Sequence, residues 1–253
     1  MNRARILVLC GFILLAGTVG LAQNDTAFES GKEAYKEENY QLAIEQWNKI
    51  LDGGEHSAAL YFNLGNAHYK LNNIGASIYY YEKARQLDQF DADIKNNLAF
   101  AENARIDVIE PLPQTVFKTW YTNVSGVFNY DGWAINAVIF AFIFVALFLS
   151  YYYSNSERRK RLLFAVSAAI MFFLVASVVL AFLTYSDHIN DNPAIIYSEE
   201  VEIRDAPSVG GEVNFLLHEG TKVQVLDKDG DWVRIRLSDG KDGWMPFTDL
   251  KEL

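Results

Sequence analysis

Histidine, cysteine and carboxylate side chains are the groups in this 253-residue chain that could carry acid–base, nucleophilic or metal chemistry. The four histidines, His56, His68, His188 and His218, show no metal-ligand spacing to one another. The only cysteine, Cys10, lies inside an apolar N-terminal run, and no pair of carboxylates is set apart for acid–base work. Neither a Gly-rich phosphate loop nor a GxSxG motif is present. The sequence therefore predicts a protein that is not an enzyme and that uses no metal or cofactor.

Binding is the remaining chemistry, and the net charge narrows the class of partner. The chain has 22 Lys and Arg residues against 32 Asp and Glu residues, which gives a formal net charge of −10. Nucleic-acid-binding modules carry basic patches, so this acidic chain disfavours a nucleic acid as the partner.

A 34-residue period organises the chain after its N-terminal run. Gly31 and Gly65 are 34 residues apart, and so are Trp47 and Tyr81. The same spacing joins Tyr35 to Tyr69, Ala43 to Ser77, and Ile50 to Ala84. Small residues let two antiparallel helices approach closely, and aromatic residues fill the space beside them. The pattern resembles the tetratricopeptide (TPR) repeat, so we expect an all-α TPR solenoid over residues 24–110, with two full repeats and a capping helix.

The first helix of each TPR unit lines the concave face, where such arrays usually bind a peptide or a partner helix. By this resemblance the groove residues are Phe28, Lys32, Tyr35, Phe62, Asn66, Tyr69, Asn96 and Phe100. Ordinary helix packing is the alternative role for the aromatic members. Asn66 also matches a position of carboxylate-clamping TPR domains, but Lys32 and Phe100 occupy the equivalent places in the other units, so a clamp is disfavoured.

After Pro193, apolar and polar residues alternate with a period of two, which is typical of strands. The dipeptides Asp229-Gly230 and Asp239-Gly240 are hairpin-turn signals between these stretches. The segments VEIRDAPS, HEGTKVQVL, GDWVRIRL and DGKDGWMP resemble the bacterial SH3 domain. The matching motif places are held by Arg204, Pro207, Gly220, Trp232, Gly243 and Trp244. We expect an all-β, SH3-like barrel over residues 192–253.

Trp232, Trp244 and Pro246 are the candidate ligand groove of this barrel, for a peptide or a cell-wall fragment. The alternative is that both tryptophans belong to the core, because a domain of this size has little core to spare.

Two uncharged runs of 25 residues, Gly132 to Ser156 and Leu162 to Ser186, lie between the TPR and SH3 segments. About 20 apolar residues span a bilayer as a helix, so we predict transmembrane helices at 133–153 and 162–185, joined by a basic loop at 154–161. The loop's basic residues are Arg158, Arg159, Lys160 and Arg161. Short loops rich in Lys and Arg stay in the cytoplasm, so both flanking modules should lie outside it.

The N-terminus gives a second, independent signal for export. Arg3 and Arg5 precede an apolar stretch that ends in small residues, which is the layout of a secretory signal peptide over residues 1–22. Cleavage after Ala22 is expected, and an uncleaved anchor is the alternative. Both place the following segment outside the cytoplasm. The predicted location is therefore a bacterial inner membrane, spanned twice, with the TPR and SH3 modules in the periplasm.

Residues 111–132, between the repeats and the first span, have apolar side chains at spacings of three and four. These include Phe117, Trp120, Tyr121 and Val124. This spacing predicts one apolar helix face, and aromatic residues next to a span suggest an amphipathic helix in the membrane interface. Packing onto the last repeat is the alternative.

The order of the modules, together with the stretch FLLHEGTKV at residues 215–223, resembles the BatE-type TPR/SH3 membrane proteins of the Bacteroides aerotolerance (Bat) operon. The resemblance implies an inner-membrane component of a Bat complex that serves tolerance of oxidative or envelope stress. It also implies partners: membrane proteins with von Willebrand A domains and a MoxR-type AAA+ ATPase.

Two function classes remain open. One is a membrane-tethered scaffold whose TPR and SH3 modules both hold protein partners. The other is an envelope sensor whose SH3 domain binds peptidoglycan. The short cytoplasmic loop offers little surface for signalling, which favours the scaffold.

Overall fold

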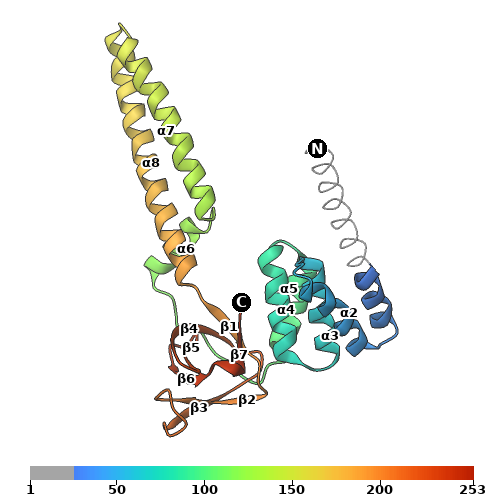
Figure 1. Ribbon diagram of the computed structural model, residues 1–253. Coiled ribbons are helices and arrows are strands. Elements are labelled where there is room, and N and C mark those ends of the chain that lie inside the picture. Colours follow the sequence, from blue (N-terminus) through green and yellow to red (C-terminus); the bar gives the residue numbers. More distant parts are fainter. Residues whose placement is uncertain (1–25) are drawn as a thin grey trace, which may run out of the picture. The chain divides into compact units, whose positions relative to one another are not determined.

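The computed structural model describes residues 26–253, so the predicted signal peptide lies outside the described residues. The chain contains N-terminal helices, a pair of long helices and a C-terminal sheet (Figure 1). The described residues up to Pro111 form one compact unit with Asn192–Leu253, and Leu112–Asp191 form a second unit. The repeats and the sheet therefore belong to the same unit, although the long helices separate them in sequence.

The repeat region consists of helices that pack in sequence order. Residues 26–36 are helical and precede α2 (Tyr40–Asp52), α3 (Ala58–Lys70), α4 (Ile74–Leu87) and α5 (Ala92–Asn103). Side-chain oxygens of Asn39, Ser57 and Asp91 each accept a hydrogen bond from a backbone N–H in the first turn of α2, α3 and α5 respectively. The helical TPR region expected from the sequence is confirmed.

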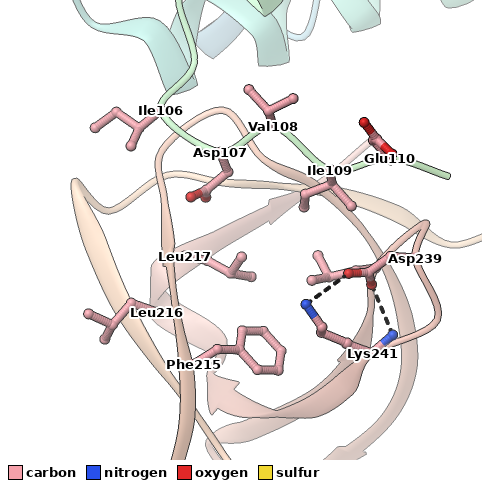
Figure 2. Close-up of a pocket in the computed structure, with 11 residues that line it drawn as sticks. Ile106, Asp107, Val108, Ile109, Glu110, Phe215, Leu216, Leu217, Asp239 and Lys241 are labelled. Atoms are coloured by element: carbon pink, nitrogen blue, oxygen red, sulfur yellow. Dashed lines mark hydrogen bonds and ion pairs between the residues drawn. The ribbon is translucent and has the colours of Figure 1, made fainter.

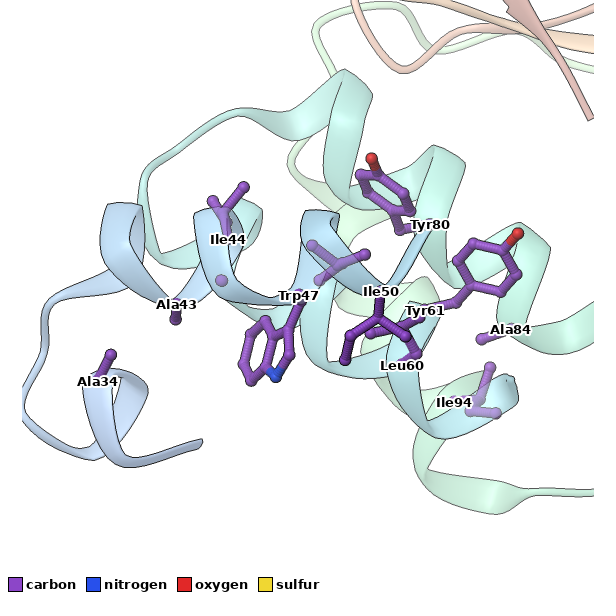
Figure 3. Close-up of a cluster of buried hydrophobic side chains, with 12 residues drawn as sticks. Ala34, Ala43, Ile44, Trp47, Ile50, Leu60, Tyr61, Tyr80, Ala84 and Ile94 are labelled. Carbon is purple, nitrogen blue, oxygen red and sulfur yellow. The ribbon is translucent and has the colours of Figure 1, made fainter. Parts of the chain in front are cut away.

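Gly31 and Gly65 show why the period is 34 residues. A Cβ atom at Gly31 would lie 2.3 Å from Nε1 of Trp47, and one at Gly65 would lie 2.6 Å from Cδ1 of Tyr81. Side chains cannot approach so closely, so each aromatic ring packs directly on a glycine of the preceding helix. Figure 3 shows Trp47 among the buried side chains of the repeat core.

The C-terminal region is one antiparallel sheet of seven strands. They are β1 (Pro193–Ile196), β2 (Glu200–Arg204), β3 (Val213–His218), β4 (Lys222–Asp229), β5 (Trp232–Arg236), β6 (Asp242–Pro246) and β7 (Leu250–Glu252). Alternate residues are buried in β2, β5 and β6, as the period-two pattern predicts: for example, Val233 and Ile235 are fully buried on either side of the exposed Arg234.

The sheet does not close into the barrel expected from the sequence. The strand order is β3-β2-β6-β5-β4-β1-β7, which leaves β3 and β7 at the edges. β2 meets β6 only where Arg204 pairs with Trp244, and the pairing of β2 with β3 shifts register between Ile203 and Arg204. Such an irregularity bends a strand and disrupts its ladder of hydrogen bonds. The prediction of an antiparallel, all-β region is therefore confirmed, whereas the predicted closed barrel is not found.

An apolar contact joins the sheet to the last two repeat helices. Ile195 of β1 is fully buried and packs in one cluster with Ile74 and Ile78 of α4 and with Leu98 and Ala101 of α5. The sheet therefore covers the apolar face at which the repeats end, and the TPR and SH3 segments share one compact unit.

Polar contacts add to this module interface. Oε2 of Glu219 accepts a hydrogen bond from the backbone N–H of Gly75 at 2.8 Å, in the first turn of α4, where Asn73 makes no side-chain cap. The Glu82 side chain is only 3 % exposed, and its Oε1 lies 2.9 Å from Nζ of Lys222. The other oxygen of Glu82, Oε2, pairs with the Arg85 guanidinium. Lys222 and Arg85 together therefore neutralise a buried carboxylate, which would be costly if left unpaired.

The second unit contains two helices that are long and apolar enough to cross a membrane. They are α7 (Tyr130–Tyr153), which contains an 18-residue window with a mean hydropathy of 2.4, and α8 (Glu157–Asn190), which contains one with a mean hydropathy of 2.7. The ring of Phe140 lies 5.9 Å from that of Phe173, and Tyr130 lies 5.7 Å from Tyr185, so the two helices run side by side as a hairpin.

The four basic residues expected in the loop between the spans lie instead in the first turns of α8. α7 ends at Tyr153 and α8 begins at Glu157, so the connection is residues 154–156 rather than 154–161. The start of α8, directly after this connection, contains Arg158, Arg159, Lys160 and Arg161. Arg and Lys are good helix formers, which allows α8 to extend back through them.

Residues 111–132 form α6 (Val116–Ser125) and the start of α7. The hydroxyl of Tyr121 donates to Oδ2 of Asp187 at 2.6 Å, and Nε1 of Trp133 donates to the carbonyl of Ser125 at 3.0 Å. Trp120 remains 65 % exposed. Within the unit, α6 therefore joins the hairpin through polar contacts and leaves Phe117 and Trp120 exposed, as an interfacial helix would.

Candidate binding sites

A cavity of about 210 Å³, here called the repeat cavity, lies in the TPR region. Its lining is aromatic and amide with one lysine: Tyr35, Asn66, Tyr69, Lys70, Tyr81, Asn97 and Phe100. The groove set expected from the sequence supplies Tyr35, Asn66, Tyr69 and Phe100. Their part in binding stays a prediction, because no ligand is present.

The other expected groove residues, Phe28, Lys32, Phe62 and Asn96, are not among the lining residues. Phe62 packs against the repeat core, and Nζ of Lys32 lies 2.9 Å from Glu29 Oε1 and 5.7 Å from the centre of the Phe28 ring. On α5 the cavity meets Asn97 instead of Asn96. Consecutive residues on a helix are about 100° apart around its axis. In the incomplete third unit, the 34-residue spacing alone did not determine which of these two residues faces the cavity.

Asn66 is held in a fixed orientation at the repeat cavity. Its Oδ1 accepts hydrogen bonds from the Tyr81 hydroxyl at 2.6 Å and from Nδ2 of Asn97 at 2.8 Å. Burial raises the pKa of Tyr81 although its hydrogen bonds to Asn97 and Ser77 act in the opposite direction, so the hydroxyl remains a donor. The Asn66 amide nitrogen donates no hydrogen bond within residues 26–253, so its two N–H donors are left for a ligand.

The expected SH3 groove residues share one face of the sheet. Trp232 lies opposite Pro246, and Trp244 lies opposite both Arg234 and Arg204. Directly paired residues project to the same face of a sheet. Here it is the face opposite to the one that carries the buried side chains of Val233 and Met245. All three candidates are half-buried and none belongs to the buried core cluster. Their role in ligand binding stays a prediction.

A second cavity, of about 450 Å³, lies where residues 106–110 pass over the sheet, and we call it the linker cavity (Figure 2). Its lining comes from that segment (Ile106, Asp107, Val108, Ile109, Glu110), from β3 (Phe215, Leu216, Leu217) and from the β5–β6 turn (Leu237, Asp239, Lys241). None of these residues is a site candidate from the sequence, because the segment 106–110 carries no repeat and no motif.

Asp107 fastens the segment to the sheet. Its Oδ2 accepts hydrogen bonds from the backbone N–H of His218 and from Oγ1 of Thr221, both at 2.7 Å, and its Oδ1 lies 2.9 Å from Nδ1 of His218. Burial acts to raise the pKa of Asp107, but the hydrogen bonds from His218 and Thr221 outweigh it and hold the pKa below its usual value. The hydrogen bond to Asp107, helped by the charges of Asp107 and Glu200, raises the pKa of His218 against a smaller effect of burial.

The stabilising effect of this contact is expected to depend on pH. The Asp107 carboxylate stabilises the fold above its ordinary pKa of 3.8 and loses this effect as the pH falls through its lower folded value. The His218 imidazolium stabilises it below 6.5, and that effect disappears as the pH rises through the raised folded value. Asp107→Asn should therefore lower the melting temperature more at about pH 5.5 than at about pH 8.5.

Glu55→Gln is the matched control, because Glu55 is exposed and forms no ion pair within residues 26–253. It should have the same small effect at both pH values. An equal effect of Asp107→Asn at the two pH values would show that His218 is not charged in this contact.

Histidines and carboxylates do not gather into a metal site in the part of the chain that the structure describes: residues 26–253 contain no group of three or more suitable ligands. The ring of His68 stacks on Tyr80 with centroids 5.3 Å apart, and burial lowers its pKa to about 4. His68 is therefore a neutral imidazole at neutral pH and packs within the repeat region.

Comparison with known families assigns two segments. Residues 199–250 match the bacterial SH3 domain family, and residues 58–91 match the tetratricopeptide repeat family. A Bacillus subtilis (strain 168) protein named as an N-acetylmuramoyl-L-alanine amidase, YrvJ, is 33 % identical over 52 residues, which are 21 % of this chain and 10 % of that protein. The chain thus spans about a tenth of the length of this curated relative.

Among solved structures, an NlpC/P60 family protein from Bacillus cereus ATCC 10987 is similar to 28 % of this chain and 23 % of its own, with 17 % identity and a TM-score of 0.22. That score is too low to assign a fold, so the assignment depends on the family matches and on the helices and strands described above. The chain contains a tetratricopeptide repeat region and a bacterial SH3 domain.

Proposed function

We propose that this protein is a membrane-anchored scaffold that holds protein partners through its TPR region and its SH3 domain, and that it acts by binding rather than by catalysis. In this proposal the hairpin α7–α8 sits in a bacterial inner membrane, and the TPR and SH3 segments lie in the periplasm. Both kinds of module are suited to protein interaction, and both apolar helices are long enough to serve as anchors.

The repeat cavity is the observation that carries the proposal. Tyr69 and Phe100 beside it are 38 % and 65 % exposed, and Asn66 presents fixed amide donors between them. Apolar burial contributes about 25 cal/mol per Å² removed from water, and a fixed amide can orient a ligand backbone. Exposed apolar rings beside a fixed amide are therefore better explained as a binding site for a peptide segment of a partner than as a surface that contacts only solvent.

Tyr69→Ala combined with Phe100→Ala should abolish capture of the membrane partner, because both changes remove apolar contact area and neither residue is in the buried core. Crosslinking in membranes, followed by identification of the crosslinked proteins, measures the capture. Apolar contacts are not screened by ions, so capture should persist as salt is raised from about 0.1 to about 0.5 M.

Phe90→Ala is the control for this experiment, since Phe90 is 82 % exposed and does not line the repeat cavity. Loss of capture by salt alone would show that the acidic faces of the module make the contact. Capture by the double variant at the wild-type level would remove the repeat cavity from the proposal.

The partners and the physiological role follow from the resemblance to the BatE-type proteins. We propose von Willebrand A-domain membrane proteins as partners of the periplasmic modules, and a MoxR-type AAA+ ATPase as a partner on the cytoplasmic side, where the basic residues of α8 would face it. The scaffold would then belong to a Bat complex that serves tolerance of oxidative or envelope stress.

Membrane topology can be tested with cysteine substitutions in a Cys10→Ser background. Cysteines at Ser57 and Ser238 should react with an impermeant thiol reagent once the outer membrane has been permeabilised, because both positions are exposed in the unit proposed to be periplasmic. A cysteine at Ser156 should not react. It directly precedes the basic start of α8, which is expected to keep this connection in the cytoplasm, where the reagent does not reach it. Labelling at Ser156 alone would reverse the orientation.

A sensor that binds peptidoglycan is the second candidate function. It is favoured by the similarity between the SH3 segment and a protein named as an N-acetylmuramoyl-L-alanine amidase. The half-buried face with Trp232, Trp244 and Pro246 is the proposed wall-binding surface. Sedimentation with purified peptidoglycan tests it: retention that Trp244→Ala removes would favour this function over the scaffold.

A further inference from the structure

The linker cavity adjoins an edge strand with an unpaired backbone position. β3 lies at one edge of the sheet. The N–H of Glu219 donates to the carbonyl of Glu199 at 3.4 Å, whereas the N–H of His218 turns to Asp107. Because backbone groups alternate along an antiparallel ladder, the N–H and C=O of Leu216 also point away from β2. Among the described residues no backbone hydrogen bond joins residues 108–110 to β3.

The strand β3 also lacks the charged and proline residues that often protect an edge. Its sequence, VNFLLH, contains no Asp, Glu, Lys, Arg or Pro, and Val213 and Leu216 are 45 % and 44 % exposed. Soluble proteins usually block such edges with charge, proline or a covering segment. Asp107 occupies the edge at His218, so the open part lies around Leu216, and an open edge is the surface that an extended peptide uses when it adds a strand to a sheet.

The lining of the linker cavity indicates which side chains an added strand would carry. Phe215 and Leu217 contribute apolar lining on the β3 side (Figure 2), and Leu237 of the β5–β6 turn adds to it. The volume of about 450 Å³ is within the common range of ligand pockets, about 300–1,000 Å³. The space is therefore large enough for apolar side chains of an added strand.

The charge of the linker cavity is not balanced. Oδ2 of Asp239 lies 3.1 Å from Nζ of Lys241, and Asp107 is engaged by His218. Glu110 forms no ion pair within residues 26–253 and is exposed. The uncompensated charge is thus negative, and its complement is a cationic side chain.

We propose that the edge of β3 and the linker cavity form one docking site for an extended, basic segment of a protein partner. The segment adds a strand beside Leu216, places apolar side chains against Phe215 and Leu237, and pairs one lysine or arginine with Glu110. This inference depends on the proposed function only in that the ligand is a protein, and it does not involve the repeat cavity.

The test starts from a display library of random ten-residue peptides selected on the detergent-solubilised full chain. Selected peptides should alternate apolar residues and carry a lysine or arginine. Fluorescence anisotropy with synthetic copies should then show that Glu110→Gln weakens binding roughly two- to fivefold, as expected for loss of one exposed ion pair. Glu55→Gln, the matched control, should leave the affinity unchanged.

Backbone N-methylation of the peptide tests strand addition without altering the protein. In an added strand only alternate amides bond to the sheet edge, so methylation at every second position should abolish binding, while methylation at the positions between should be tolerated. Leu216→Lys supplies a second check, because a lysine at this edge should repel a basic peptide while the melting temperature stays near that of the wild type.

Several results would overturn the inference: no enriched peptide, enrichment of acidic peptides, indifference to Glu110→Gln, or no alternation in the methylation series. Binding of purified peptidoglycan that depends on Glu110, with no peptide bound, would assign the site to the cell wall instead. If no peptide binds but Tyr69→Ala with Phe100→Ala still abolishes partner capture, this inference fails and the proposed scaffold function stands.

Discussion

Replacing Gly65 by alanine should destabilise the repeat region by about 1–3 kcal/mol or more, the usual cost of forcing extra volume into a packed core. The added Cβ would lie 2.6 Å from Cδ1 of Tyr81, whose side chain is 1 % exposed. The ring cannot move away without breaking the hydrogen bond from its hydroxyl to Asn66. The variant should therefore lose both stability and the fixed amide of the repeat cavity.

Thermal unfolding of the solubilised full chain, followed by circular dichroism, measures this effect. Gly210→Ala is the control, because a Cβ there would meet nothing within 4 Å, and such surface changes usually stay within about 0.5 kcal/mol. Tyr81→Leu in the Gly65→Ala background should recover part of the stability by removing the ring. Equal melting temperatures for Gly65→Ala and Gly210→Ala would disprove the packing argument.

The repeats could be predicted from the sequence because their determinants are local and periodic. The contact of Gly65 with Tyr81 recurs as Gly31 with Trp47, and the 34-residue spacing reports both. The strands were predictable for the same reason, since a period of two follows from alternate burial. Where the period is interrupted, the prediction was weaker: at the single helix of the third unit it named Asn96, but Asn97 lines the repeat cavity.

Contacts between segments distant in sequence could not be predicted in this way. Asp107 bonds to His218 across 111 residues, and Glu82 pairs with Lys222 across 140. Hydrophobic patterns show which face of an element is buried but not which element covers it. The linker cavity therefore has no signal in the sequence, and neither does the open sheet, which has a bulge at Ile203 and Arg204 and a contact from Ile109 to its core.

Ile195→Ala should destabilise the TPR and SH3 segments together, by about 2–5 kcal/mol, the range for truncating a buried isoleucine. Ile195 is fully buried, and its neighbours Ile74 and Ile78 belong to α4, on the other side of the module interface. Amide hydrogen exchange should show faster exchange in α4 as well as in β1. Faster exchange confined to the strands would mean that the sheet does not stabilise the repeats.

A fragment of residues 26–111 extends this prediction, because it exposes Ile74, Ile78 and Leu98 to water and should melt below the same helices in the full chain. The consequence reaches the binding site, since α4 carries both Ile78 at the module interface and Tyr81 at the repeat cavity. Loosening α4 should weaken the hold of Tyr81 on Asn66 and hence the affinity for a partner peptide. Linkage is reciprocal, so a peptide bound in the repeat cavity should in turn slow exchange in α4 of the wild type, and less so in Ile195→Ala.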